Sequence, residues 1–220
     1  MIIIAQRFFP ICSQITTRLL LCQVYKIYNV GMVEILPSVT TVYGVDWRSM
    51  VTEVKELGLT RIALFLTGLD SSSRQQCYQL LRTVPNLSVP FVHARSDMTE
   101  QEYRLLIKDF GTQKFNLHSP RAWPMKYPVP QEIKAKIYLE NADTVPDDAE
   151  LAEFGGLLID TSHLENDRRV DPEAFTKTLE LINKYGVGVN HLSPISDVPF
   201  DDEWGIHFDT HKFISLKGYD

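Results

Sequence analysis

Eight histidine and carboxylate side chains stand at or just after the ends of short apolar runs in this sequence. They are His93, His118, Glu140, Asp160, His163, His191, Asp209 and His211. Imidazole nitrogens and carboxylate oxygens together suit a divalent Zn, Mn, Fe or Co ion. Several carboxylates buried at one place would repel one another, and a cation relieves that repulsion. The pattern therefore predicts a divalent metal site, on the condition that the ends of these runs meet in the fold.

The elements that would bring these ends together are short strands alternating with amphipathic helices. The strand candidates lie at residues 34–39, 61–66, 91–93, 114–118, 136–140, 156–160 and 188–192. Helical patterns separate most of them. Asp46 precedes an apolar helical face, Thr99 and Glu102 form a capping-box pattern, and Asp171 opens a helix that runs to Tyr185. Strands that alternate with helices imply parallel strands joined by crossovers.

This arrangement predicts an α/β fold of the (β/α)8-type TIM barrel, in which the carboxyl ends of all strands face one side. The candidate ligands would converge there. A doubly wound sheet is the competing architecture, but neither G-x-G-x-x-G nor G-x-x-x-x-G-K-[ST] occurs in the sequence. No eighth strand is evident before Asp220, so we expect the barrel over 32–220 to be short or incomplete at its C-terminal end.

Composition and charge exclude several classes of protein. The 220 residues are 44% hydrophobic and 23% charged, which is typical of a globular protein and excludes disordered and collagen-like chains. Lys and Arg number 22 against 28 Asp and Glu, a net charge of −6, so no global positive field draws the chain to DNA or anionic lipid. Three cysteines are too few for a disulfide framework, which favours a cytoplasmic setting.

Residues 1–31 differ from the rest, because they carry Arg7, Arg18 and Lys26 and no acidic residue. These charges leave no uncharged apolar window of the ~18 residues that a membrane span needs. We expect residues 1–31 to be an N-terminal extension outside the folded domain, with Met32 as the start of that domain. A targeting presequence is the alternative.

Five short segments carry a family resemblance over about 34–220. They are Phe115-Asn116-Leu117-His118, Tyr138-Leu139-Glu140-Asn141, Ile159-Asp160-Thr161-Ser162-His163, Asn190-His191-Leu192-Ser193 and Asp209-Thr210-His211. On these segments the chain resembles the xylose isomerase-like barrel superfamily, which contains sugar isomerases and epimerases together with the endonuclease IV group. The Asp-Thr-x-His step occurs in both branches. The Asp-x-His step, with His93 and His118 upstream, looks more like the trinuclear zinc site of endonuclease IV.

The resemblance implies that all eight candidate residues are metal ligands. It also exposes a departure, because the family glutamate at the end of the eighth strand has no counterpart before Asp220. In the epimerase branch that glutamate is one of two catalytic carboxylates, and in the endonuclease branch it is a metal ligand. The departure therefore bears on both activities.

Three functions follow as hypotheses. The preferred one is an enzyme that performs endonuclease IV-like, zinc-dependent phosphoester hydrolysis on abasic-site DNA or a similar substrate, with Glu140 as the catalytic carboxylate. The alternative is a sugar or sugar-phosphate isomerase or epimerase that uses one Mn, Mg or Co ion, with Glu140 as general base. A degenerate, non-catalytic barrel is the third. No membrane and no obligate protein partner is expected.

Substrate contacts are predicted from loops that should surround the mouth of the barrel. Arg121 and Trp123 lie in the proline-rich stretch 119–131, and Lys212 follows His211. A guanidinium or ammonium group would bind phosphate, and an indole would stack on a sugar or an unpaired base. These three residues complete the predicted site.

Overall fold

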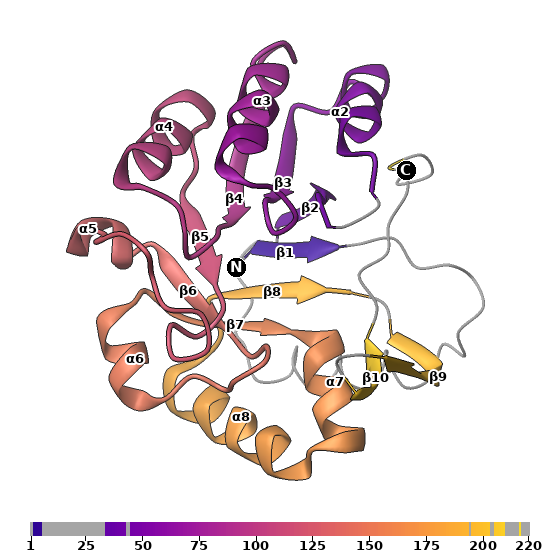
Figure 1. The fold of residues 1–220 in the computed structure, drawn as a ribbon, viewed down its shortest axis with the longest axis vertical. Coiled ribbons are helices and arrows are strands. Elements are labelled where there is room, and N and C mark those ends of the chain that lie inside the picture. The colour runs from indigo at the N-terminus through magenta and orange to yellow at the C-terminus, as the bar shows by residue number, and fades with distance from the viewer. Residues whose placement is uncertain are drawn as a thin grey trace.

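The computed structural model describes residues 2–5, 34–42, 45–193, 195–202, 205–209 and 216, and its centre is a parallel sheet (Figure 1). The strands of that sheet are β1 (Ile2–Ala5), β2 (Glu34–Val39), β3 (Arg61–Phe65), β4 (Ser88–His93), β5 (Lys114–Leu117), β6 (Ile137–Glu140), β7 (Gly156–Asp160) and β8 (Val189–Leu192). All strands predicted from the sequence are present, and β4 begins three residues earlier than expected. The mixed α/β class and the parallel arrangement are therefore confirmed.

The sheet curls until its first and last strands meet. Each strand from β1 to β8 pairs in parallel with its neighbour in the chain, and β1 also pairs with β8, which closes the order. Ile2 stands opposite both Glu34 and Val189 in this register. The expectation that residues 1–31 lie outside the fold is thus wrong for Ile2–Ala5, and the place expected to be empty at the C-terminal end is filled by β1.

The physical reason is that the pairing is long-range. A run of β-branched isoleucines suits a central parallel strand, but β2 and β8, the partners of this run, are distant in the sequence. Residues 6–33 lie outside the described residues.

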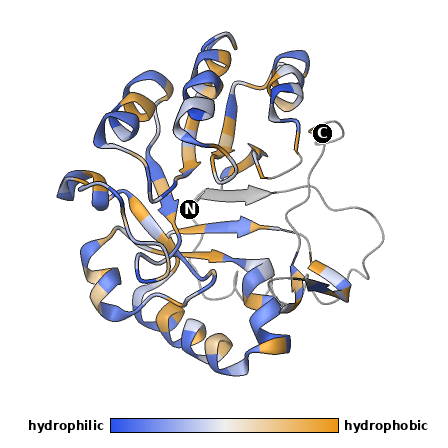
Figure 2. Cartoon of the chain, viewed as in Figure 1, coloured by the Kyte–Doolittle hydropathy of each residue, from blue (hydrophilic) through white to orange (hydrophobic). Residues whose placement is uncertain are grey.

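Helices cover the outside of the sheet, as Figure 1 shows. They are α2 (Trp47–Glu56), α3 (Ser71–Leu81), α4 (Glu100–Phe110), α5 (Gln131–Lys134), α6 (Asp148–Glu153), α7 (Thr161–Val170) and α8 (Pro172–Tyr185). The predicted caps are present: Asp46 accepts from Ser49 N, Thr99 and Glu102 form a capping box, and Asp171 accepts from Ala174 N. Helices such as α2, α3 and α4 carry both hydrophobic and hydrophilic residues along their length (Figure 2). Among the described residues no helix is both long and apolar enough to cross a membrane.

A hairpin that the sequence analysis did not anticipate follows β8. Strands β9 (Ile195–Asp202) and β10 (Gly205–Asp209) pair antiparallel and lie beside α7. Asn166 Oδ1 accepts a hydrogen bond from Phe208 N at 2.9 Å, and Arg169 donates to the Ser196 carbonyl at 3.1 Å. These bonds attach the hairpin to α7, so Asp209 is held close to the carboxyl end of β7.

The core has two layers. A large apolar cluster fills the space between the sheet and the helices, and a small one fills the inside of the curled sheet. The inner cluster consists of Leu36, Ala63, Phe65, Phe91, Leu158 and Val189. This cluster fills the interior of the sheet next to the carboxyl ends of the strands. Polar side chains at those ends therefore pack against apolar residues on their inner side.

Helices α3 and α4 are joined by a buried ion pair, which generates a stability prediction. Arg74 is fully buried and donates to both carboxylate oxygens of Glu102, at 2.8 and 3.0 Å. Replacing Glu102 with Ala leaves this buried guanidinium short of its main counter-charge, so we expect a loss of roughly 3 kcal/mol or more in the free energy of unfolding. Urea denaturation measures it. Glu100→Ala, which removes an exposed partner of Arg104 on the same helix, should cost under about 1 kcal/mol; equal losses would contradict the prediction.

Candidate metal centre

The carboxyl ends of five neighbouring strands bring the predicted donors together. His93 ends β4, Glu140 ends β6, Asp160 ends β7, His191 lies in β8, and His118 directly follows β5. In the strand register, Asp160 stands opposite His191. Because these strands are parallel, their carboxyl ends lie on one side of the sheet, as predicted.

Glu140 is the centre of this group. Its side chain is 2% exposed, and its two oxygens face different histidines. Oε2 lies 3.1 Å from His93 Nε2 and 3.8 Å from His118 Nε2, whereas Oε1 lies 3.1 Å from His191 Nδ1. Asn116 Nδ2 donates to Oε2 at 2.5 Å. Burial alone would raise the pKa of Glu140, but the charge and hydrogen bond of His191, and of His93 when that ring is protonated, outweigh it and hold that pKa well below the usual range.

His93 is oriented by the backbone. Its Nδ1 lies 3.0 Å from the Ala94 carbonyl oxygen, and because a carbonyl only accepts, Nδ1 carries a proton. Burial lowers the pKa of His93 despite the nearby Glu140, which favours the neutral ring. The lone pair on Nε2 then faces the carboxylate oxygen of Glu140 at 3.1 Å, and two acceptors at that distance need a proton or a cation between them.

Two phenylalanine rings pack against His191, and one of its two ring nitrogens makes no hydrogen bond within the described residues. Phe65 and Phe91 of the inner cluster pack against its ring at centroid distances of 4.8 and 5.4 Å. Its Nδ1 donates to Glu140, and its buried Nε2 has no hydrogen-bond partner among the described residues. Burial would lower the pKa of His191, but the carboxylates of Glu140 and Asp160 raise it to about 9.

Asp160 is fixed through both carboxylate oxygens. Oδ1 accepts from Ser162 N at 2.7 Å and from Ser162 Oγ at 2.6 Å, which caps α7, and Oδ2 accepts from Ser193 Oγ at 2.9 Å. Oδ2 also lies 3.7 Å from His191 Nδ1. Asn141 binds the Asp160 backbone at both its N–H and its carbonyl. The carboxylate therefore has a single, well-defined position.

Two groups of three donors result, and both could hold a metal ion. One is His93, His118 and Glu140; the other is Glu140, Asp160 and His191. Within each group, one donor atom per residue lies within 4.8 Å of the others. Glu140 belongs to both groups, so the two candidate sites are neighbours that share one carboxylate.

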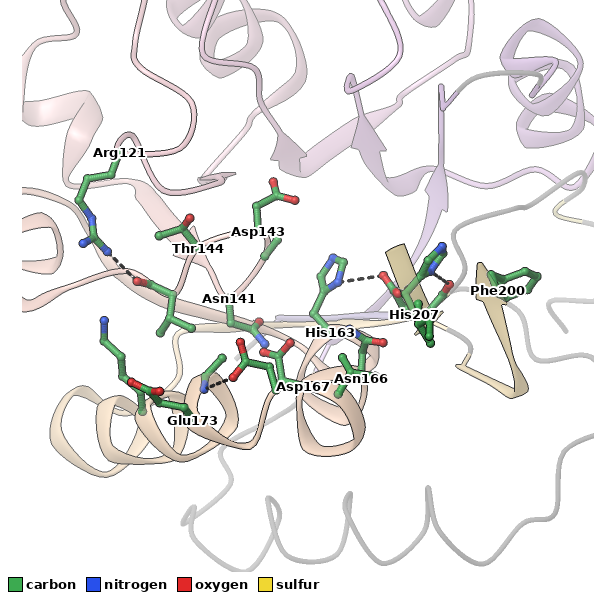
Figure 3. A pocket seen from close by; sticks show the side chains of 18 of the residues that line it. Arg121, Asn141, Asp143, Thr144, His163, Asn166, Asp167, Glu173, Phe200 and His207 are labelled. Carbon is green, nitrogen blue, oxygen red and sulfur yellow. Dashed lines mark hydrogen bonds and ion pairs between the residues drawn. The ribbon is translucent and has the colours of Figure 1, made fainter. Parts of the chain in front are cut away.

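Two further predicted ligands form a separate pair. His163 Nδ1 lies 3.0 Å from Asp209 Oδ2, and His207 Nδ1 lies 3.0 Å from Asp209 Oδ1. Figure 3 shows the contact that reaches from His163 toward the hairpin. Burial opposes the charge on His163, but Asp160 and Asp209 raise its pKa to about 10. His163 and Asp209 belong to neither group of three, and His211 lies outside the described residues.

A cavity of about 1030 Å³ opens beside the site, between the loop after β6, α7, the start of α8 and the hairpin (Figure 3). Its lining includes Asn141 and His163, which touch Asp160. Carboxylates outnumber Lys and Arg in this lining. The acidic residues are Asp143, Asp167, Asp171, Glu173 and Asp209, and the basic ones are Arg121 and Lys177.

The predicted substrate-binding residues make contacts within the protein. Arg121 lines the cavity, and its guanidinium contacts Glu150, Asp147 and the carbonyl of Val145. Trp123 is half-exposed and donates its indole N–H to Asp143. Lys212 lies outside the described residues. A role in substrate binding stays a prediction for all three.

Sequence reasoning missed several residues that orient the donors. Asn116 and Asn141 lie in the segments that carried the family resemblance, next to a proposed ligand or two positions away, and that adjacency was the available signal. Ser193 offered the same signal, because it follows His191 by two positions. Asp143 gave no signal, because its partner His118 is distant in sequence.

The two raised histidine pKa values predict how stability depends on pH when metal is removed. A histidine whose pKa is higher in the folded state than the ordinary ~6.5 stabilises the fold fully below that value, and the contribution is lost as pH rises through the folded-state pKa. With pKa values of about 9 for His191 and about 10 for His163, the Tm in EDTA should fall between roughly pH 6.5 and pH 10.

Thermal denaturation across that range measures the effect. His163→Gln should lower the Tm at pH 6.5 and flatten its decline toward pH 10, because the variant has no proton to lose at this position. A parallel decline in both proteins would contradict the assignment of the effect to His163.

Comparison of the chain with protein-family models, with curated proteins and with solved structures finds no match.

Proposed function

We propose that this chain is a divalent-metal-dependent enzyme built on a xylose isomerase-like TIM barrel and that it hydrolyses phosphoesters in the manner of endonuclease IV. The observation that carries the proposal is the division of the Glu140 carboxylate, with Oε2 facing His93 and His118 and Oε1 facing His191. A carboxylate shared in this way would serve as a ligand in both groups of donors, and many phosphoesterases hold two neighbouring metal ions.

The donor atoms fit a cation. The Nε2 of His93 and the Oε2 of Glu140 face each other as acceptors 3.1 Å apart. A cation between them would satisfy both groups. Mixed nitrogen and oxygen donors favour zinc, with Mn, Mg or Co as alternatives.

The roles of the residues follow from their contacts. Asn116 fixes one oxygen of Glu140, and Ser162 and Ser193 fix both oxygens of Asp160, so both carboxylates are oriented before any substrate arrives. When bound, divalent ions would supply an activated water and stabilise the attacking and leaving oxygens of the phosphoester. His163 projects into the cavity and carries a proton at neutral pH, which suits contact with an anionic oxygen.

The lining of the cavity favours a second candidate. Its carboxylates exceed its Lys and Arg residues, and Arg121 is already held by Glu150 and Asp147. Such a lining suits the hydroxyl groups of a neutral polyol better than a polyanion. A sugar isomerase or epimerase that uses one metal ion, with Glu140 as general base, is therefore the alternative proposal.

Metal content and turnover test the proposal together. We expect two or three zinc ions per chain by elemental analysis and cleavage of DNA that contains an abasic site. Glu140→Gln should lower the metal content and reduce cleavage by more than about 100-fold, which corresponds to roughly 2.7 kcal/mol of transition-state stabilisation. Glu132→Gln is the control, because Glu132 is exposed and pairs only with Arg104 in the described structure.

Two other outcomes would contradict phosphoester hydrolysis. One exchangeable Mn, Mg or Co ion and turnover of a sugar in a substrate panel would replace hydrolysis by isomerisation. Absence of metal and of turnover on both kinds of substrate would leave a degenerate barrel and refute both enzymatic proposals.

A further inference from the structure

Asp143 lines the cavity and connects His118 with the exposed indole of Trp123. It lies in the loop after β6, and its Oδ2 accepts two hydrogen bonds, one from His118 Nδ1 at 2.9 Å and one from Trp123 Nε1 at 2.7 Å. The backbone of Asp143 has φ +53°, a left-handed conformation that residues other than glycine seldom adopt, although Asn and Asp tolerate it best. The loop therefore holds the carboxylate at a defined place.

The consequence for His118 is a fixed tautomer. A carboxylate accepts only, so the Nδ1 of His118 carries the proton, and Nε2 points toward Glu140 Oε2, 3.8 Å away. A carboxylate on the outer nitrogen of a metal-binding imidazole orients the ring and raises its basicity. His118 is less buried than His93 and His191, so it has the greatest need of such a support.

The consequence for Trp123 is a link to the same oxygen. The indole is 48% exposed, yet its N–H is anchored to the carboxylate that holds His118. A change in the charge or position of His118 therefore alters the environment of the Trp123 indole, because both side chains bind the same Asp143 oxygen.

We propose that Asp143 is a positioning residue that orients His118 for metal binding and that the emission of Trp123, whose indole binds the same carboxylate oxygen, reports occupancy of the centre at the protein surface. This inference rests on the metal centre of the proposed function and adds two residues to it. Neither His118 nor Glu140 needs to move far, since the donor atoms already face one another.

Substitutions that keep the left-handed backbone separate this role from a purely structural one. Asp143→Gly removes the side chain and relieves the backbone, and Asp143→Asn keeps the shape and one acceptor but removes the charge. Zinc affinity is measured by competition with a chromophoric chelator. We expect a loss of about 10- to 100-fold for Asp143→Gly and a smaller loss for Asp143→Asn. Asp109→Asn, which alters only an exposed pair with Arg82, should leave the affinity unchanged.

Fluorescence provides the second readout. Trp47 and Trp204 are replaced by Phe so that Trp123 is the remaining tryptophan of the chain. Addition of Zn²⁺ should change the Trp123 emission, and Asp143→Gly in this background should abolish the change.

The outcomes distinguish this inference from the proposal on which it rests. If the wild-type chain binds zinc and folded Asp143→Gly binds it equally well, the positioning role of Asp143 is refuted and the metal centre stands. If Asp143→Gly weakens zinc binding but Zn²⁺ does not change the Trp123 emission of the chain that keeps Asp143, the link between the centre and Trp123 is refuted. If the wild-type chain binds no zinc, both proposals fail.

Discussion

The contact between the buried carboxylate of Glu140 and three imidazole rings is the interaction on which the rest of the site depends. A carboxylate in this position has lost its hydration, so its charge must be balanced by protons or cations close by. His93, His118 and His191 reach it from three different strand regions, and Asn116 fixes its orientation. Closing the parallel sheet is what brings these side chains within reach of one oxygen pair.

Structural and chemical roles overlap in the same residues. Asp160 caps α7 through Ser162 and also stands beside His191, so the helix that begins there and the donor group share one carboxylate. Asp209 ends the hairpin and pairs with His163, which ties the wall of the cavity to the start of α7. A substitution at either aspartate therefore alters the packing and the chemistry together, and substitutions at Glu140 or Asp143 separate the two more cleanly.

The ends of most strands could be predicted from the sequence, whereas the contacts between loops could not. The positions of His93, Glu140 and Asp160 at strand ends could be predicted because each residue ends an apolar run. Such a run is recognised from neighbouring residues alone. Asp143 was missed because its partners are His118 and Trp123, which only the folded loops bring near. The strand Ile2–Ala5 was missed because its partners, β2 and β8, are more than 25 and more than 180 residues away. The occupation of Arg121 by Glu150 is likewise a tertiary contact.

A proton and a metal ion would compete for the same positions in this site. In the absence of metal, Glu140 and Asp160 raise the pKa of His191 to about 9, so a proton on that ring balances part of the buried negative charge at neutral pH. A metal ligand must be deprotonated, so binding at Glu140, Asp160 and His191 displaces that proton. A cation at this group would therefore replace positive charge that the folded chain already carries, and its affinity would weaken as pH falls. The carboxylates that would favour a cation also favour its competitor, the proton. Asn116, Ser193 and the Ala94 carbonyl fix the directions of the donor atoms, and such fixed directions would favour a metal ion with a defined coordination geometry.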